Sequence, residues 1–259
     1  MTEDSVRRPP LDVARLTDAP WPVEILAEAG STNALLSDRA RNGAAPQVLA
    51  TEHQTAGRGR LDRTWETPDR AALTFSLLLR PTLEAQRWPW LPLYAGLAVA
   101  DALPPGRVDL KWPNDVLVDD LKLAGILVER VDTPTGAAAI VGIGINVSTT
   151  REELPVETAT SLALAGIEID RTDLFRGVLD SLQRGYDAWL AGGDEWLRDR
   201  YSERCATIGR EVRVALPGDV ELTGRAAGID GSGRLLVEAT TGEVAVGAGD
   251  VVHVRAATE

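Results

Sequence analysis

The chain contains almost none of the residues that build disulfides or zinc sites. It has 259 residues but only one cysteine, Cys205, and two histidines, His53 and His253. One cysteine cannot form an intramolecular disulfide, and no His/Cys spacing resembles that of a zinc site. A disulfide-stabilised secreted domain and a zinc domain are therefore not expected, and a reducing, cytoplasmic location fits the composition best.

Long apolar runs and two common catalytic motifs are also missing. The most apolar segment, 137–145, is interrupted by Gly142 and falls well short of the ~20 residues of a membrane span. Residues 1–20 include Arg7 and Arg8 but no apolar core of a signal peptide. Neither a GxxxxGK[ST] loop nor a GxSxG elbow occurs, which excludes a P-loop NTPase and an elbow-serine hydrolase.

Positive charge is in short supply. The 27 Lys and Arg residues face 39 Asp and Glu residues, which gives a formal net charge of −12. A net negative field argues against non-specific nucleic-acid binding, but it leaves room for a small anionic ligand held by a local cluster of cations. With 44% hydrophobic and 25% charged residues, the chain has the composition of a soluble globular protein.

The distribution of aromatic residues divides the chain. All of them lie between Trp21 and Tyr201, whereas 209–259 has none and is rich in glycine. We therefore predict a larger unit over 1–207 and a smaller one over 208–259, with the first 20 residues loosely held.

Apolar patterning predicts the elements of both units. A mixed sheet flanked by helices, hence an α+β fold, follows for the larger unit, and five short strands with turn signals predict a small barrel for the smaller one. The expected helices are 31–41, 89–103, 172–190 and 193–205. The expected strands are 23–27, 48–53, 72–79, 108–110, 116–118, 123–131, 138–146, 211–216, 220–228, 235–238, 243–246 and 251–254.

A loop over 54–70 alternates glycine with arginine at Gly57, Arg58, Gly59 and Arg60. Glycine lets the backbone approach a ligand closely, and arginine offers planar donors suited to phosphate or carboxylate. An anion cradle and a solvated turn are about equally consistent with the motif alone. Nearby acidic residues balance its charge, so selectivity for an anion would have to come from geometry.

Two lysines stand beside the predicted strands. Lys111 precedes Asn114 and Asp115, whose oxygens could bind Mg²⁺, although an Asx turn with an exposed salt bridge explains this segment better when it is taken alone. Lys122 stands at the mouth of an apolar strand and could neutralise a ligand's charge, or it could simply be solvated.

Glycines interrupt the most apolar strand at Gly142 and Gly144, which is typical of close approach by a ligand or of a bulge. This Gly-x-Gly does not open a helix with a third glycine, so it is not a dinucleotide fingerprint.

Taken together and in this order, the motifs closely resemble those of the biotin–protein ligases (biotin–[acetyl-CoA-carboxylase] ligases) over about residues 23–255. The segments that carry the resemblance are Ser31-Thr32-Asn33, the loop from Gln54 through Arg60 with Arg63 and Trp65, KWPND over 111–115, KLAGIL over 122–127, and GIGIN over 142–146. The resemblance implies a catalytic domain related to class II synthetases, over 1–207, followed by an SH3-like barrel over 208–259.

The same resemblance assigns expected roles. The catalytic residues would be Arg58, Arg60, Lys111, Asp115 and Lys122, with Asp115 also at a Mg²⁺ ion. The residues that bind biotin and its adenylate would be Ser31, Thr32, Asn33, Gln54, Gly57, Arg58, Gly59, Arg60, Arg63, Trp65, Lys122, Gly125, Leu127, Gly142, Gly144 and Asn146.

The implied activity uses ATP to convert biotin into biotinyl-5′-AMP and then transfers biotin to a lysine of the biotin carboxyl carrier domain of acyl-CoA or pyruvate carboxylases. Only about 22 residues precede the first strand, so the resemblance implies the monofunctional class without a DNA-binding domain, as a monomer or weak homodimer, with no DNA or membrane partner. The alternative is a lipoate–protein ligase or octanoyltransferase of the same fold.

Overall fold

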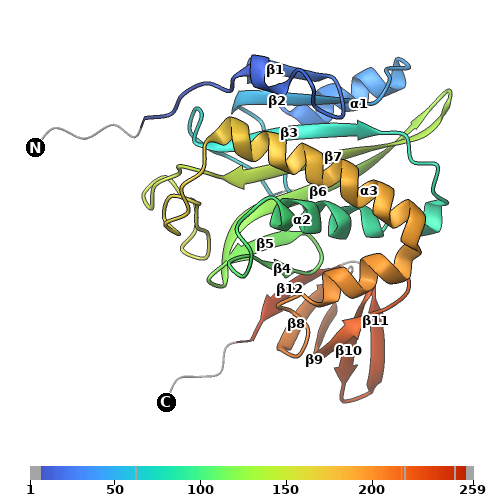
Figure 1. Ribbon diagram of the computed structural model, residues 1–259. Helices are drawn as coiled ribbons and strands as arrows, with labels where there is room; N and C mark the ends of the chain where they lie inside the picture. The colour runs from blue at the N-terminus through green and yellow to red at the C-terminus, as the bar shows by residue number, and fades with distance from the viewer. Residues whose placement is uncertain (1–6, 62, 217, 219, 248, 255–259) are drawn as a thin grey trace, which may run out of the picture.

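A computed structural model describes residues 7–61, 63–216, 218, 220–247 and 249–254. The chain forms a large mixed sheet flanked by helices and a smaller antiparallel sheet near the C-terminus (Figure 1). This architecture confirms the predicted fold class. No helix in the described ranges is long and apolar enough to cross a membrane.

The large sheet has the strand order β1-β2-β3-β7-β6-β5-β4, in which only β1 and β2 are parallel. The apolar runs in the sequence predicted these strands correctly, since each expected strand overlaps an observed one. The bounds are β1 Val23–Ala29, β2 Gln47–Gln54, β3 Ala72–Leu79, β4 Asp109–Lys111, β5 Asp115–Val118, β6 Leu121–Thr133 and β7 Gly136–Asn146.

In the described residues, three α-helices pack on the large sheet: α1 (Thr32–Arg41), α2 (Trp90–Asp101) and α3 (Arg171–Ser202). This unit also contains two short 3-10 turns, η1 (Val13–Leu16) and η2 (Ala85–Arg87). Ser31 caps α1 by accepting a hydrogen bond from the Ala34 amide, as its predicted N-cap role requires. Helix α3 is interrupted at Gly193, whose φ of 74° is not helical, so the predicted break between two helices is confirmed.

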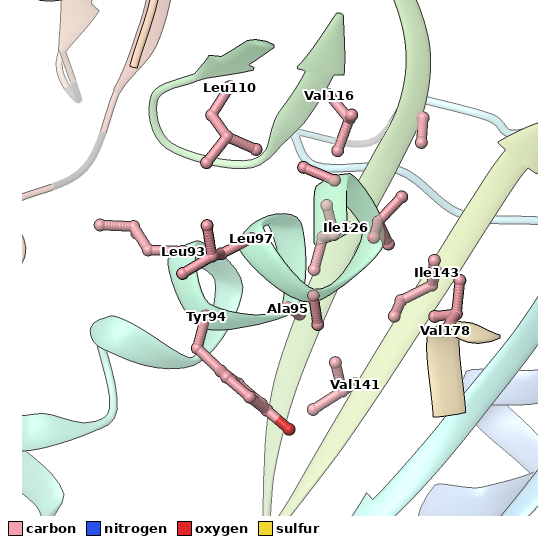
Figure 2. Packing of buried hydrophobic residues seen from close by; sticks show 14 of the residues in the cluster. Leu93, Tyr94, Ala95, Leu97, Leu110, Val116, Ile126, Val141, Ile143 and Val178 are labelled. Atoms are coloured by element: carbon pink, nitrogen blue, oxygen red, sulfur yellow. The ribbon is translucent and has the colours of Figure 1, made fainter. Parts of the chain in front are cut away.

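Side-chain alternation along β3 separates the core from the site. Leu73, Phe75 and Leu77 point to the face covered by α2 and α3, whereas Leu78 packs against α1 on the opposite face. Figure 2 shows side chains of α2 packed against Ile126, Val141 and Ile143 of β6 and β7. Since successive strand residues face opposite sides, the residues between these core positions face α1.

The smaller sheet has the order β11-β10-β9-β8-β12. Its strands are β8 Glu211–Leu216, β9 Val220–Ile229, β10 Leu235–Ala239, β11 Gly242–Val246 and β12 Asp250–His253. Two tryptophans of the larger unit hold it: the indole Nε1 of Trp90 donates to the Gly231 carbonyl at 3.3 Å, and that of Trp112 donates to Gly233 at 3.0 Å. One core cluster continues across both sheets, and the domain boundary at 208 stays a prediction.

The segment before β1 is held firmly from residue 7 onward, so the expectation of a loose N-terminus was wrong for residues 7–20. Arg8 forms an ion pair with Glu153 at 2.5 Å, and the Leu11 amide donates to Glu52 at 2.7 Å. These contacts could not be predicted from local sequence, because Glu153 and Glu52 lie far along the chain from Arg8 and Leu11. Residues 1–6 lie outside the described part.

His253 on β12 predicts a pH dependence of stability. Its Nε2 lies 3.1 Å from Thr207 Oγ1, and its Nδ1 faces Arg210 at 3.3 Å. Burial and the nearby charges of Lys111 and Arg210 lower the pKa of His253 from 6.5 to about 4. The unfolded chain therefore takes up a proton at a higher pH than the folded one, and stability is lost as the pH falls from about 6.5 to about 4.

Replacing His253 with glutamine removes the contribution of His253 protonation to the pH dependence of stability. We expect the loss in free energy of unfolding between pH 7 and pH 4.5 to shrink by about 1–2 kcal/mol, after discounting for partial exposure to solvent. Urea unfolding at both pH values checks this, with His53→Gln, an exposed histidine on β2, as the control. An unchanged pH dependence in His253→Gln would contradict the prediction.

Candidate active site

A pocket opens on the α1 side of the large sheet, where four elements meet: α1, β6, β7 and the Gly/Arg loop, by which we mean residues 57–61 and 63–65. It encloses about 110 Å³. Of the predicted site residues, those that line it are Ser31, Thr32, Asn33, Gln54, Arg58, Gly59, Arg60, Arg63, Trp65, Asp115, Lys122, Gly125, Leu127, Gly142 and Gly144. The structure therefore brings most of the predicted residues into one cavity.

One wall of the pocket is a hydrogen-bonded polar network. Ser76 Oγ donates to Thr32 Oγ1 at 2.7 Å or to Asn33 Oδ1 at 2.6 Å. Gln54 Oε1 accepts from the Thr32 amide at 3.1 Å, and Asn33 Nδ2 donates to the Leu127 carbonyl at 3.3 Å. The start of α1 thus presents fixed hydroxyl and amide groups to the cavity.

Glycines let bulky side chains lie against the sheet. A Cβ added to Gly142 would sit 2.3 Å from Asn33 Oδ1, and one added to Gly144 would sit 2.4 Å from the Trp65 indole. Gly125 pairs with Gly144 across β6 and β7, so the indole lies over both. Trp65 Nε1 is buried and has no hydrogen-bond partner among the described residues, which leaves a free donor at the pocket.

Each arginine of the loop is held by a different protein acceptor. Arg58 pairs with Glu129 at 3.2 Å. Arg60 donates to Asn114 Oδ1 at 2.9 Å and to the Gly249 carbonyl at 3.0 Å, and burial lowers the pKa of Arg60. Arg63 forms an ion pair with Asp250. Three arginines that line the pocket are therefore each held by a protein acceptor.

Beside the arginines, a second cluster of charged residues consists of Lys111, Asp115 and Lys122. Asp115 Oδ1 is buried and has Lys122 Nζ as its ion-pair partner at 2.7 Å, without hydrogen-bond geometry. Lys111 lies directly opposite Asp115 across the β4–β5 pair. Burial lowers the pKa of Lys111, although the charge of Asp115 opposes the shift.

Three predicted site residues lie outside this pocket lining. Gly57 instead lines an adjoining cavity of about 590 Å³ on the other side of the Gly/Arg loop. Asn146 is buried and donates to the Thr160 carbonyl at 3.0 Å, which holds the segment after β7. Lys111 lies behind Asp115 and lines neither cavity.

Sequence reasoning missed the contribution of the smaller sheet. Asp250 lines the pocket, and the Gly249 carbonyl contacts Arg60. Both come from the short turn before β12, almost 190 residues from the arginines that they bind. No local motif marks them, because the pairing depends on how the two sheets dock.

A Mg²⁺ ion has few protein ligands here. In the part of the chain that the structure describes, no group of three or more His, Cys, Asp or Glu side chains could hold a metal ion. Mg²⁺ is usually bound through one or two carboxylates together with substrate phosphates and water. Asp115, in the second cluster of charged residues, fits that mode of binding.

Comparison with known proteins agrees with this geometry. Residues 27–146 match the Biotin/lipoate A/B protein ligase family, and residues 207–254 match the Biotin protein ligase C terminal domain. The biotin–[acetyl-CoA-carboxylase] ligase of Mycobacterium tuberculosis is 41% identical over 271 residues, which cover 98% of this chain and 100% of that protein. The chain belongs to the biotin/lipoate A/B protein ligase family.

A second curated protein and a solved structure are also similar to this chain. The bifunctional ligase/repressor BirA of Escherichia coli is 35% identical over 222 residues, covering 83% of this chain and 69% of BirA. The biotin protein ligase from Aquifex aeolicus, solved in complex with biotin and ATP, has a TM-score of 0.77 and 30% identity, and the match covers 91% of this chain and 99% of that one. The resemblance drawn from the motifs is thereby confirmed.

Proposed function

We propose that this chain is a biotin–protein ligase, which activates biotin with ATP and transfers it to a carrier lysine. The observation that carries the proposal is a single pocket that is lined both by a hydrogen-bonded polar wall and by a cluster of cations. A ligand that combines a polar head with a carboxylate matches such a lining. The relatives named for biotin ligation support the same assignment.

The polar wall favours biotin over the alternative acids. Thr32, Asn33 and Gln54 offer fixed donors and acceptors that suit a ureido ring. The alkyl chain of octanoate or the dithiolane of lipoate would displace water from these groups without replacing its hydrogen bonds, which is costly for buried polar groups. The free Trp65 Nε1 donor adds one more polar contact for the ligand.

The cations serve the first half-reaction. A biotin carboxylate oxygen attacks the α-phosphorus of ATP, the bond from that phosphorus to the bridging oxygen breaks, and pyrophosphate leaves. Two anions must approach each other, so positive donors fixed beforehand lower the barrier most. Arg58, Arg60 and Lys122 line the pocket in positions to meet these groups, with Arg63 beside them, and Lys111 lies behind Asp115.

In the second half-reaction, the carrier lysine's amine attacks the acyl carbon of biotinyl-5′-AMP, and AMP leaves with the bonding electrons. We assign Asp115 to orienting the incoming ammonium and assisting its loss of a proton, since its carboxylate lies in the pocket as the ion-pair partner of Lys122. Asp115 would also hold Mg²⁺ brought with ATP, and the ion would neutralise phosphate charge. The acceptor we propose is the biotin carboxyl carrier domain of a carboxylase.

Pyrophosphate exchange into ATP tests the assignment directly. Purified protein is given ATP and labelled pyrophosphate with biotin, lipoate or octanoate, and we expect exchange with biotin alone. Exchange with lipoate or octanoate in place of biotin would move the assignment to the lipoate branch of the family. Absence of exchange with all three acids would overturn the proposed activity.

A further inference from the structure

The Gly/Arg loop, here residues 57–61 and 63–65, has few bonds of its own. Its internal backbone bonds run from the Gly59 amide to the Arg63 carbonyl at 2.6 Å, from Trp65 to Gly57 at 2.9 Å, and from Arg63 to Arg60 at 3.2 Å. Three backbone bonds hold a short turn together. What fixes the turn against the rest of the molecule must therefore come largely from its side chains.

Two of its arginines reach the smaller sheet. Arg63 meets both carboxylate oxygens of Asp250, with Nη1 at 3.5 Å from Oδ1 and Nη2 closer to Oδ2. Arg60 donates to the carbonyl of the neighbouring Gly249 at 3.0 Å. Paired guanidinium–carboxylate contacts fix orientation as well as position. The loop is thus tied to one short turn of another sheet.

Gly249 and Asp250 are held against β8. A Cβ on Gly249 would lie 2.8 Å from Val214 Cγ1 and 2.9 Å from the Ala215 carbonyl oxygen, so the turn packs directly on β8. Asp250 then pairs with Ala215 in the ladder between β12 and β8. The carboxylate is therefore positioned by the smaller sheet and not by the loop.

The loop separates two spaces of unequal size. The pocket beneath it encloses about 110 Å³, while the adjoining cavity on its other side has about 590 Å³. Pockets for drug-sized ligands usually span about 300–1,000 Å³. An acyl adenylate needs more room than the pocket beneath the loop offers, so we expect the loop to shift when the adenylate binds or leaves.

We propose that Asp250 is a positioning residue that latches the Gly/Arg loop over the pocket through Arg63 and so slows release of the activated acid. This rests on the proposed ligase function. The contact suits a reversible latch, because the Arg63 side chain is 61% exposed and that of Asp250 is 32% exposed. Exposed pairs of this kind are weak and screened by salt, so they break without disturbing the fold.

Asp250→Asn tests the latch while preserving the shape of the side chain. We expect adenylate release to accelerate about 3- to 5-fold, as loss of an exposed pair predicts, while biotin-dependent pyrophosphate exchange persists. Release is followed as AMP formed without a carrier protein, since escaped adenylate hydrolyses. Hydrogen exchange of the Gly59, Arg63 and Trp65 amides in the ligand-free protein should also speed up.

Glu221→Gln is the matched control, because it removes the Arg213–Glu221 contact (3.6 Å) of the same sheet, and neither residue lines either cavity beside the loop. Asp250→Glu should restore slow release. Unchanged release and unchanged loop exchange in Asp250→Asn would overturn the latch. If the wild type shows no exchange into ATP, the proposed function fails, and amide exchange alone then decides the latch. If Asp250→Asn does not fold, the wild type decides: loop exchange that stays constant from 50 to 500 mM salt would overturn the proposal.

Discussion

Lys122→Gln is expected to lower biotin-dependent pyrophosphate exchange by about 10²–10³-fold. Removal of one fixed donor from a site of developing charge typically has an effect of this size. The Lys122 ammonium lies 2.7 Å from Asp115 and 6.0 Å from the centre of the Trp65 ring, inside the pocket. Its loss removes a cation and also leaves the Asp115 carboxylate unpaired where two anions must meet.

The main chain at Lys122 is held on both of its edges before substrate binds. The Lys122 amide donates to the Thr158 carbonyl at 2.8 Å, and the Lys122 carbonyl accepts from the Thr160 amide at 2.8 Å. On its other side Lys122 pairs with Leu117 of β5. Since both edges are held, little reorganisation is needed during the reaction, which is the condition for a large electrostatic effect.

Arg130→Gln is the control for this prediction, because it removes an exposed cation of the same strand that pairs with Asp132, lies over the Trp88 ring and does not line the pocket. Exchange by that variant should equal that of the wild type. The double variant Lys122→Gln/Asp115→Asn should recover part of the lost rate if the unpaired carboxylate contributes to the loss. A rate for Lys122→Gln within about threefold of the wild type would refute the assigned role.

The strands and helices were predictable because their signals are local. The run over 72–79 was expected as a strand and forms β3, and the break at Gly193 was visible as a glycine pair after an apolar helix. The site motifs were also local, since each is a short run of residues close together in the sequence. Lys111 and Lys122 are the only lysines of the chain, and both belong to these motifs.

Long-range pairing could not be read from the sequence. Arg60 and Arg63 were expected to bind biotin or its adenylate, and the structure adds that they contact Gly249 and Asp250, which lie far along the chain. Gly142 and Gly144 were expected to bind biotin or its adenylate, and the structure adds that Asn33 and Trp65 lie against them. In each case the partner is chosen by tertiary packing, which residue type and spacing do not encode.

The buried pair of Glu52 and Arg171 is another long-range feature and gives the largest expected effect on stability. Their side chains are only 7% and 6% exposed. Arg171 also donates to the Ala72 carbonyl at 3.1 Å and to the Pro9 carbonyl at 3.0 Å, while Glu52 accepts from the Leu11 amide at 2.7 Å. The pair therefore joins β2, β3, α3 and the N-terminal segment.

Glu52→Ala should lower the free energy of unfolding by about 3–5 kcal/mol, because it leaves Arg171 buried without its counter-ion. Urea unfolding measures the change. Asp38→Asn, which breaks an exposed Arg41–Asp38 pair at 2.8 Å, is the control and should cost under about 0.5 kcal/mol. Replacing both buried partners, as Glu52→Leu/Arg171→Met, should cost less than Glu52→Ala alone, since no charge then remains buried. A double variant that loses more stability than Glu52→Ala would show that the hydrogen bonds of Arg171 to Ala72 and Pro9, and not the unpaired charge, dominate the energetics of this pair.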